Sequence, residues 1–236
     1  MIHAFQFNGK SSLDFGVYIS WDKNYDAPER DVELISVPGR SGDLIIDNGR
    51  FKNIEITYPA FIANGFEHKW SPFKAHMMKS ATYERLEDTY DLEHFRKAVF
   101  LGATEPKVVD FRRKAAFKIT FNCKPQRWLK SGEEAVTYTQ GSVIYNPTEF
   151  PAKPLLMVIG YGQITIGDYR IVIAQHTGNR VWIDCELQDA WLETSNLNSV
   201  ITLPDGEFPQ IEPGAVSVSF PSTIQSVQIT PRWWTV

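Results

Sequence analysis

The chain has 236 residues, of which 43% are hydrophobic and 22% are charged, and its formal net charge is −4. These values are those of an ordinary globular protein and exclude disordered and fibrous classes. The length suits one large all-β domain or two smaller domains, and we favour two. The longest apolar stretches, such as residues 155–159, are far shorter than the roughly 20 residues that a membrane helix needs. Since no signal-peptide pattern is present at the N-terminus, we expect folding in a cytoplasm and no membrane partner.

The charge divides unevenly along the chain. Residues 1–130 carry 20 Lys and Arg against 17 Asp and Glu, whereas residues 131–236 carry 4 against 11. The short connection after Lys130 contains Ser131 and Gly132, at the point where the charge balance changes sign. We therefore predict two domains, 1–130 and 131–236.

In the first half, short apolar runs alternate with turn residues. Such runs predict strands at residues 5–7, 17–19, 44–46, 54–58 and 116–121. The seven Lys and Arg between Arg112 and Lys130 meet no acidic residue. Because several of them alternate with apolar residues, we interpret this basic run as the solvated face of a strand rather than a phosphate-binding surface.

A loop is predicted around Pro38, Gly39, Arg40 and Gly42. Two glycines within four residues, directly after a proline, indicate a backbone that needs positive φ angles. The spacing lacks the Gly-x-Ser-x-Gly pattern of a nucleophile elbow, so loop geometry is the better explanation. These four residues are the candidate assembly-interface loop.

One α-helix is predicted near residues 71–79. Ser71 suits the N-cap and Pro72 the first helical position, while Phe73, Met77 and Met78 supply an apolar side. Residues 82–100 fit either a second, amphipathic helix or a hairpin, and periodicity alone does not decide between them.

The second half predicts strand after strand, at residues 136–139, 155–159, 163–166, 171–174, 181–185, 216–220 and 224–229. Many short strands at close spacing indicate an antiparallel β-sandwich. The fold class is therefore mainly β with one α-helix.

No residue pattern indicates catalysis, a cofactor or a metal. Gly160, Gly162 and Gly167 lack the spacing and the following helix that a dinucleotide loop needs. The five histidines are scattered without ligand partners, and Cys123 and Cys185 suit two small buried side chains better than a disulfide. We expect no enzyme, no cofactor and no metal site.

The chain ends with Trp233 and Trp234 on a predicted strand. Adjacent side chains of a strand point to opposite faces, so one tryptophan can fill the core while the other covers a neighbouring residue or a partner. A sugar-stacking platform is the alternative, and core packing is favoured over it.

The order of the motifs resembles the distal tail proteins of long-tailed phages over the whole chain. The matching motifs are Phe5-x-Phe7-Asn8-Gly9-x-x-Ser12-x-x-Phe15-Gly16, Pro38-Gly39-Arg40-x-Gly42, Phe121-x-Cys123-x-Pro125, Asn146-Pro147, Ala152-x-Pro154, Gly160-x-Gly162, Ile183-Asp184-Cys185-Glu186, Phe208-Pro209-x-Ile211-x-Pro213-Gly214 and Pro231-Arg232-Trp233-Trp234. No single motif would suffice, but their collinear order makes coincidence improbable.

The resemblance implies a homohexameric ring formed by a β-barrel-like N-terminal domain, with a galectin-like sandwich at its periphery. Its implied partners are the tail tube protein on one face and a tail-tip, fibre or baseplate protein on the other, with DNA only passing through the channel. The implied location is the tail tip of the virion, after assembly in the bacterial host cytoplasm.

Two other functions stay open. One is a carbohydrate-binding protein that contacts host cell-wall glycans through the C-terminal β-sandwich, and the other is a glycan-cleaving enzyme. Since 28 acidic residues always offer some carboxylate pair, such a pair carries little weight as support for the enzyme.

Overall fold

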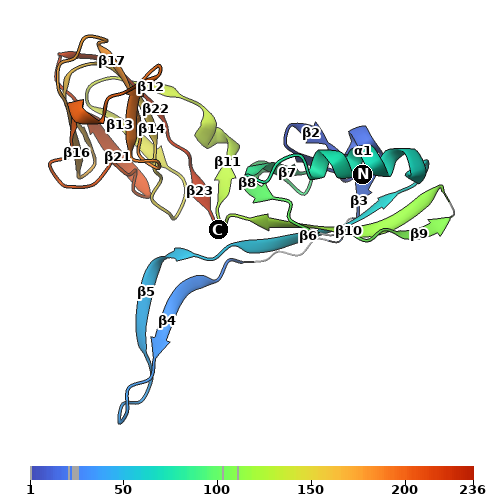
Figure 1. Ribbon diagram of the computed structural model, residues 1–236. Helices are drawn as coiled ribbons and strands as arrows, with labels where there is room; N and C mark the ends of the chain where they lie inside the picture. Colours follow the sequence, from blue (N-terminus) through green and yellow to red (C-terminus); the bar gives the residue numbers. More distant parts are fainter. Residues whose placement is uncertain (1, 21, 23–26, 103, 111) are drawn as a thin grey trace. The chain divides into compact units, whose positions relative to one another are not determined.

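The computed structural model describes residues 2–20, 22, 27–102, 104–110 and 112–236. The chain divides into two compact units (Figure 1), which we call unit 1, Met1–Arg127 with Val236, and unit 2, Trp128–Thr235. Each unit encloses its own cluster of buried apolar side chains. Independent folding of residues 1–130 and 131–236 stays a prediction.

Unit 1 is built on one antiparallel sheet in the order β2-β1-β7-β8-β10-β6-β3, and β9 pairs with β10. An isolated bridge joins His3, just before β1, to Ile19 in β3. Because β1 and β3 lie toward opposite ends of the strand order, this bridge curls the sheet back on itself into a partial barrel. The strands are β1 (Phe5–Phe7), β2 (Lys10–Ser11), β3 (Val17–Ile19), β6 (Ile54–Ile62), β7 (Glu84–Asp88), β8 (Asp91–Val99), β9 (Lys107–Asp110) and β10 (Lys114–Cys123).

The alternating sequence of β10 explains its place in the middle of the sheet. Ala115, Phe117 and Ile119 are buried, while the intervening Lys114 and Lys118 are exposed. Side chains of a strand alternate between its two faces, so one face of β10 joins the core and the other meets water. The interpretation of this part of the basic run as a solvated strand face is therefore confirmed.

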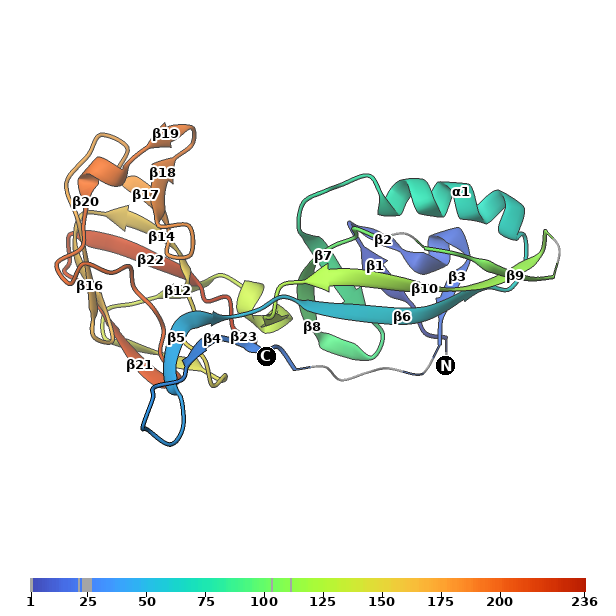
Figure 2. The same cartoon turned by 60° about the horizontal axis from the view of Figure 1, so that its bottom comes forward.

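The helix α1 (Phe66–Met77) begins six residues earlier than predicted, since Gly65 rather than Ser71 is the N-cap and Pro72 lies inside the helix. The predicted N-cap at Ser71 is wrong. A proline inside a helix costs about 3 kcal/mol, but Trp70 and Phe73 on either side of it pack against Phe117 in the core. Phe73 and Met77 are buried as predicted, whereas Met78 is exposed. Figure 2 shows α1 lying across one side of the sheet.

Residues 82–100 form a hairpin and not a helix. Strands β7 and β8 pair in an antiparallel register that brings Glu84 opposite Ala98 and Asp88 opposite Asp91. The Asp88 carboxylate accepts hydrogen bonds from the backbone N–H groups of Tyr90 and Asp91 and so fixes the turn.

Unit 2 is an antiparallel sandwich of two sheets, in the orders β12-β22-β14-β17-β18-β19 and β13-β21-β15-β16-β20. The predicted fold class is therefore confirmed: mainly β with one α-helix in the described residues. The strands of the sandwich are β12 (Val136–Tyr138), β13 (Ser142–Asn146), β14 (Leu155–Gly160), β15 (Gly162–Ile166), β16 (Tyr169–Ile173), β17 (Arg180–Asp184), β18 (Asp189–Leu192), β19 (Ser195–Asn196), β20 (Ile201–Thr202), β21 (Gly214–Ser219) and β22 (Ile224–Thr230). The last strand, β23 (Trp234–Thr235), belongs to neither of these two sheets.

One charged pair in unit 2 is largely enclosed. Arg232 donates two hydrogen bonds of 2.8 Å to the two carboxylate oxygens of Asp184, whose side chain is 5% exposed. Burial opposes ionisation of Asp184, but the hydrogen bonds from Arg232 and from backbone N–H groups outweigh it and lower its pKa. These two parallel hydrogen bonds fix the position of Arg232, which directly precedes the two terminal tryptophans.

The two terminal tryptophans pack within unit 2. Trp233 is 6% exposed in the core, and its backbone carbonyl accepts a hydrogen bond from Leu129. Trp234 stacks on Phe150 with ring centroids 4.4 Å apart, and its indole N–H donates to the carbonyl of Pro151. The prediction that one tryptophan fills the core while the other covers a neighbour is confirmed.

The connection after β11 (Arg127–Leu129) is a 3-10 turn, Lys130–Glu133.

We expect Trp233→Ala to lower the unfolding free energy of unit 2 by about 3–5 kcal/mol, because it empties a buried indole site. Trp234→Ala, which removes a partly exposed ring, should have a smaller effect. Thermal unfolding followed by far-UV circular dichroism measures both variants against the parent chain. Equal melting temperatures for the Trp233→Ala variant and the parent would contradict the assignment of Trp233 to the core.

Candidate functional site

The most exposed element of unit 1 is a hairpin of β4 (Arg30–Ile35) and β5 (Leu44–Phe51), which we call the arm, residues 30–51. Within the described part of the chain these two strands pair only with each other. Nearly every residue of the arm is exposed, and the chain passes from β5 into β6 through only Lys52 and Asn53.

Both faces of the arm carry apolar side chains. Leu34 lies opposite Ile45 on one face, and these two residues are 60% and 64% exposed. On the other face Ile35 lies opposite Leu44 and Glu33 opposite Ile46, and all three apolar residues are exposed. A hairpin with one core face and one solvent face would show polar residues on the second face. The arm therefore presents two apolar faces.

Exposed ion pairs hold the base of the arm. Arg30 pairs with Asp47 at 2.9 Å, and Arg50 pairs with Asp31 at 2.7 Å. The hydrogen bond from Arg50 lowers the pKa of Asp31, and hydrogen bonds from the Gly49 N–H and from Arg30 lower the pKa of Asp47. Surface pairs of this kind contribute little stability, so they set the register of the strands more than they stabilise the hairpin.

The predicted loop forms the tip of the arm. Pro38, Gly39, Arg40 and Gly42 all lie in the connection between β4 and β5 and are exposed. Gly39 has φ +79° and Gly42 has φ +84°, as their spacing predicted. The Arg40 N–H donates to the carbonyl of Val37 and closes the first turn. The sequence also makes the polar and glycine-bearing segments from Asp22 to Arg50 candidates for contacts in a ring, and residues 23–26 of this stretch lie outside the described residues.

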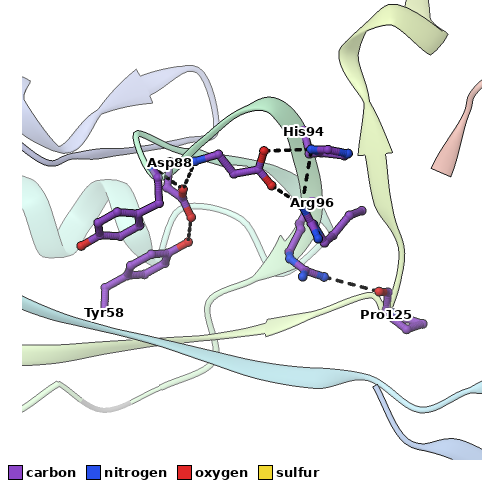
Figure 3. Close-up of polar contacts among 8 residues, drawn as sticks. Tyr58, Asp88, His94, Arg96 and Pro125 are labelled. Carbon is purple, nitrogen blue, oxygen red and sulfur yellow. Dashed lines mark hydrogen bonds and ion pairs between the residues drawn. The ribbon is translucent and has the colours of Figure 1, made fainter. Parts of the chain in front are cut away.

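The second feature of unit 1 is a cavity of about 470 Å³, lined mainly by residues of β6, β7 and β8, some apolar, such as Ile56 and Leu86, and others polar. Figure 3 shows its hydrogen bonds. The Tyr58 hydroxyl donates to Asp88 at 2.7 Å, and burial, reinforced by the Asp88 carboxylate, raises the pKa of Tyr58. Arg96 donates to the backbone carbonyl of Pro125 at 3.4 Å.

A second carboxylate in the cavity, that of Asp91, contacts an imidazole and a guanidinium group. Asp91 lies 2.8 Å from the Nδ1 atom of His94 and 2.5 Å from the guanidinium of Arg127. Burial opposes ionisation, but these two contacts outweigh it and lower the pKa of Asp91. A general base needs a pKa near the working pH. Since Asp91 stays ionised and Tyr58 stays protonated at neutral pH, the geometry is that of a fixed polar network.

The two cysteines are buried thiols. Burial raises the pKa of Cys123 to about 12 and raises the pKa of Cys185 as well. A thiol in such surroundings is a poor nucleophile. In the part of the chain that the structure describes, no three His, Cys, Asp or Glu side chains are grouped to hold a metal ion. No helix among the described residues is long and apolar enough to cross a membrane.

The third feature is a row of side chains on the outer face of the six-stranded sheet of unit 2. Strand register places Trp182 of β17 opposite Trp191 of β18 and next to Met157 of β14. Gln228 and Asn196 continue the row on either side. Val181 and Ile183, the neighbours of Trp182, are buried, so Trp182 points away from the core and is half-buried.

Sequence reasoning found the tip of the arm but missed two of these features. The run Leu44-Ile45-Ile46 predicted a strand, yet nothing in the run shows that both faces stay exposed. The Trp182–Trp191 pair depends on the register of two strands, which no local pattern gives. The signal for the arm was the position of an apolar run next to a loop with two glycines.

No protein-family model matches the chain, and no curated protein sequence matches it. Solved structures of phage proteins do resemble it. The Dit protein (gp 19.1) of phage SPP1, described as a paradigm of the hub adsorption apparatus in phages that infect Gram-positive bacteria, covers 100% of both chains with a TM-score of 0.73 and 9% identity. Two structures of the phage P2 baseplate in its activated conformation, one with Ca and one with Sr, have TM-scores of 0.54 and 0.52 and 11% identity. Each covers 97% of this chain, and the chain covers 98% and 97% of them.

The likeness to SPP1 Dit confirms, at the level of the fold, the resemblance to distal tail proteins that the collinear motifs indicate. It runs over both units and over the full length of each chain. The fold is therefore that of phage hub and baseplate proteins.

We expect the double variant Gly39→Val, Gly42→Val to loosen the arm without unfolding unit 1. No atom lies within 4 Å of a Cβ built at either glycine, so the strain comes from φ alone. Left-handed backbone costs a residue with a side chain about 1–2 kcal/mol. Hydrogen–deuterium exchange should become about tenfold or more faster in residues 30–51, with little change in melting temperature.

Gly206→Val is the matched control, because Gly206 in unit 2 also has φ +79° and no atom near its built Cβ. This variant should leave exchange in the arm unchanged. Unaltered exchange in the arm of the double variant would show that the tip does not need its two glycines.

Proposed function

We propose that this protein is a structural, non-enzymatic distal tail protein that assembles as a ring of six copies at the end of a phage tail tube. The observation that carries the proposal is the likeness to SPP1 Dit over 100% of both chains. The collinear motifs support it independently, because they follow the same order through both units.

The arm supports an assembly role. An isolated two-stranded hairpin is marginal in water, and apolar side chains on both of its faces gain stability only when another surface covers them. A closed ring is made by heterologous contacts, in which one patch meets a different patch of the next copy. The arm with its tip residues Pro38, Gly39, Arg40 and Gly42 is the candidate donor patch.

The partial barrel of unit 1 forms the ring in this proposal, and unit 2 lies at its periphery. The partners are the tail tube protein on one face and a tail-tip, fibre or baseplate protein on the other, and DNA passes through the channel. The location is the tail tip of the virion, reached by assembly in the host cytoplasm. In this role the polar network at Asp88 and Asp91 holds the β7–β8 hairpin in shape.

Light scattering during size-exclusion chromatography tests the ring, with negative-stain microscopy on the same fractions. We expect the full chain, alone or mixed with its tail-tip partner, to give six times the monomer mass and a ring with a central hole. Ile46→Glu should raise the protein concentration needed for ring assembly by tenfold or more, because it places a charge on an apolar face of the arm.

Val143→Glu is the matched control, since Val143 is also a β-branched residue on a strand and is 61% exposed, but lies in unit 2. It should assemble like the parent. A strict monomer at high concentration, with and without the partner, would contradict the proposed ring.

A second candidate function, the binding of cell-wall glycans by the sandwich, is favoured by the row at Trp182 and Trp191. Two tryptophans side by side on a solvent face, with Gln228 and Asn196 beyond them, combine flat apolar surface with amide hydrogen-bonding groups. Trp233 and Trp234 are not the platform, because they pack within unit 2.

Calorimetric titration with cell-wall polysaccharide tests this second function. If the row binds glycan, Trp182→Ala and Trp191→Ala should each weaken binding about tenfold, or about 1.4 kcal/mol. Tyr145→Ala, which truncates a residue that is 67% exposed on the other sheet, is the control and should bind like the parent. Absence of heat with the parent chain would exclude the row as a site for that polysaccharide.

A further inference from the structure

Unit 1 has a shallow groove of about 710 Å³ on the face of the sheet that α1 does not cover. Its apolar floor comes from Pro59 and Phe61 of β6 and Ala116 of β10, and Phe61 is 41% exposed. Lys107 and Lys118 stand at its sides, and no ion pair links either to another described residue. Glu105 lines the groove as well, so the groove combines apolar surface with two lysines and one carboxylate.

One face of the arm has the complementary character. Ile35, Leu44 and Ile46 provide apolar side chains, and Glu33 lies among them opposite Ile46. Glu33 makes no ion pair within the described chain, whereas the other acids of the strands, Asp31 and Asp47, already pair with arginines. The apolar side chains of this face could cover the floor of the groove, and Glu33 could pair with a lysine at the side of the groove.

The arm and the groove lie at opposite ends of the same strand. The arm joins β6 at Ile54, while the groove begins at Pro59 and continues to Phe61. At about 3.3 Å per residue these ends are separated by roughly 20 Å, and β5 runs a further 25 Å or so outward. A donor at one end and an acceptor at the other is the arrangement that heterologous contacts need to continue from copy to copy.

We propose that the groove is the acceptor for the arm of a second copy of this chain, with Glu33 of the arm paired with Lys118 of the groove. The inference rests on the proposed ring and adds to it the identity of the contact between copies. Leu34 and Ile45, on the opposite face of the arm, stay available for a further surface of the assembly.

Disulfide formation between copies tests the contact directly. Leu44→Cys and Ala116→Cys are placed in separate chains with tags of different length, and the two chains are co-expressed and oxidised. A product containing both tags is expected in high yield, because the two Cβ atoms should come within disulfide range. Native Cys123 and Cys185 add little background, since both are buried. Leu44→Cys with Val143→Cys is the control and should give almost no mixed product.

Charge exchange gives a second readout that does not depend on oxidation. Glu33→Lys and Lys118→Glu should each weaken ring assembly about tenfold, and the double variant should regain most of the loss. Glu134→Lys, at an exposed site in unit 2, controls for net charge and should assemble like the parent.

The outcomes separate this inference from the proposed function. A six-fold ring without the mixed disulfide and without rescue by the double variant would overturn the arm–groove contact and leave the ring intact. A monomer under all conditions would overturn both. A ring with the mixed disulfide and with rescue establishes the contact.

Discussion

Apolar side chains on both faces of a two-stranded hairpin need two covering surfaces, and the described chain places neither on the arm. Leu34 and Ile45 on one face, and Ile35 and Leu44 on the other, are exposed although each would gain by burial. Scattered apolar residues at a surface are ordinary, but a contiguous set on one small element marks an interaction site. The proposed contact between the arm and a second copy of the chain starts from this exposed apolar surface.

The rest of unit 1 is suited to hold such an arm at a fixed place. Strand β6 continues the arm into the sheet and pairs with β10 from Ile54 to Ile62, the longest register in the unit. Aromatic side chains, among them Phe5, Tyr58 and Phe121, pack against each other beneath it. A strand that lies on a packed core fixes the place where the arm leaves the sheet, so in the proposed ring the contact would depend on the partial barrel as much as on the arm.

Local patterns predicted the elements whose physics is local. The alternation of Ala116 to Phe121 predicted the strand and its solvated face, and the glycines at 39 and 42 predicted positive φ. The start of α1 was missed because Pro72 reads as a helix beginning, while the packing of Trp70 and Phe73 on Phe117 decides where the helix lies. The run Leu44-Ile45-Ile46 predicted a strand. An apolar run does not show, however, whether its side chains are buried within their own chain or against another copy.

The candidate surfaces are less predictable from the sequence than the strands are, because they depend on contacts between distant segments. The Trp182–Trp191 pair and the groove at Phe61 arise from register between strands that lie apart in the sequence. Only the motif order, which carries no geometry, pointed to an assembly before the fold was known. The tip of the arm was the exception, because glycine spacing marks backbone conformation within a few residues.

An uncovered hairpin can also pair, edge to edge, with a strand of an unrelated protein. The arm has features that hinder such pairing. Its edges carry Arg30, Asp31, Asp47 and Arg50 in ion pairs, and the register shifts between Arg30 and Val32. Charged residues and bulges on an edge strand hinder edge-to-edge addition of another strand. Because the edges at the base of the arm are protected in this way while both faces stay apolar, a face of the arm is the surface that we propose for assembly. A groove in the next copy fits that requirement, whereas extension of the sheet by another strand does not.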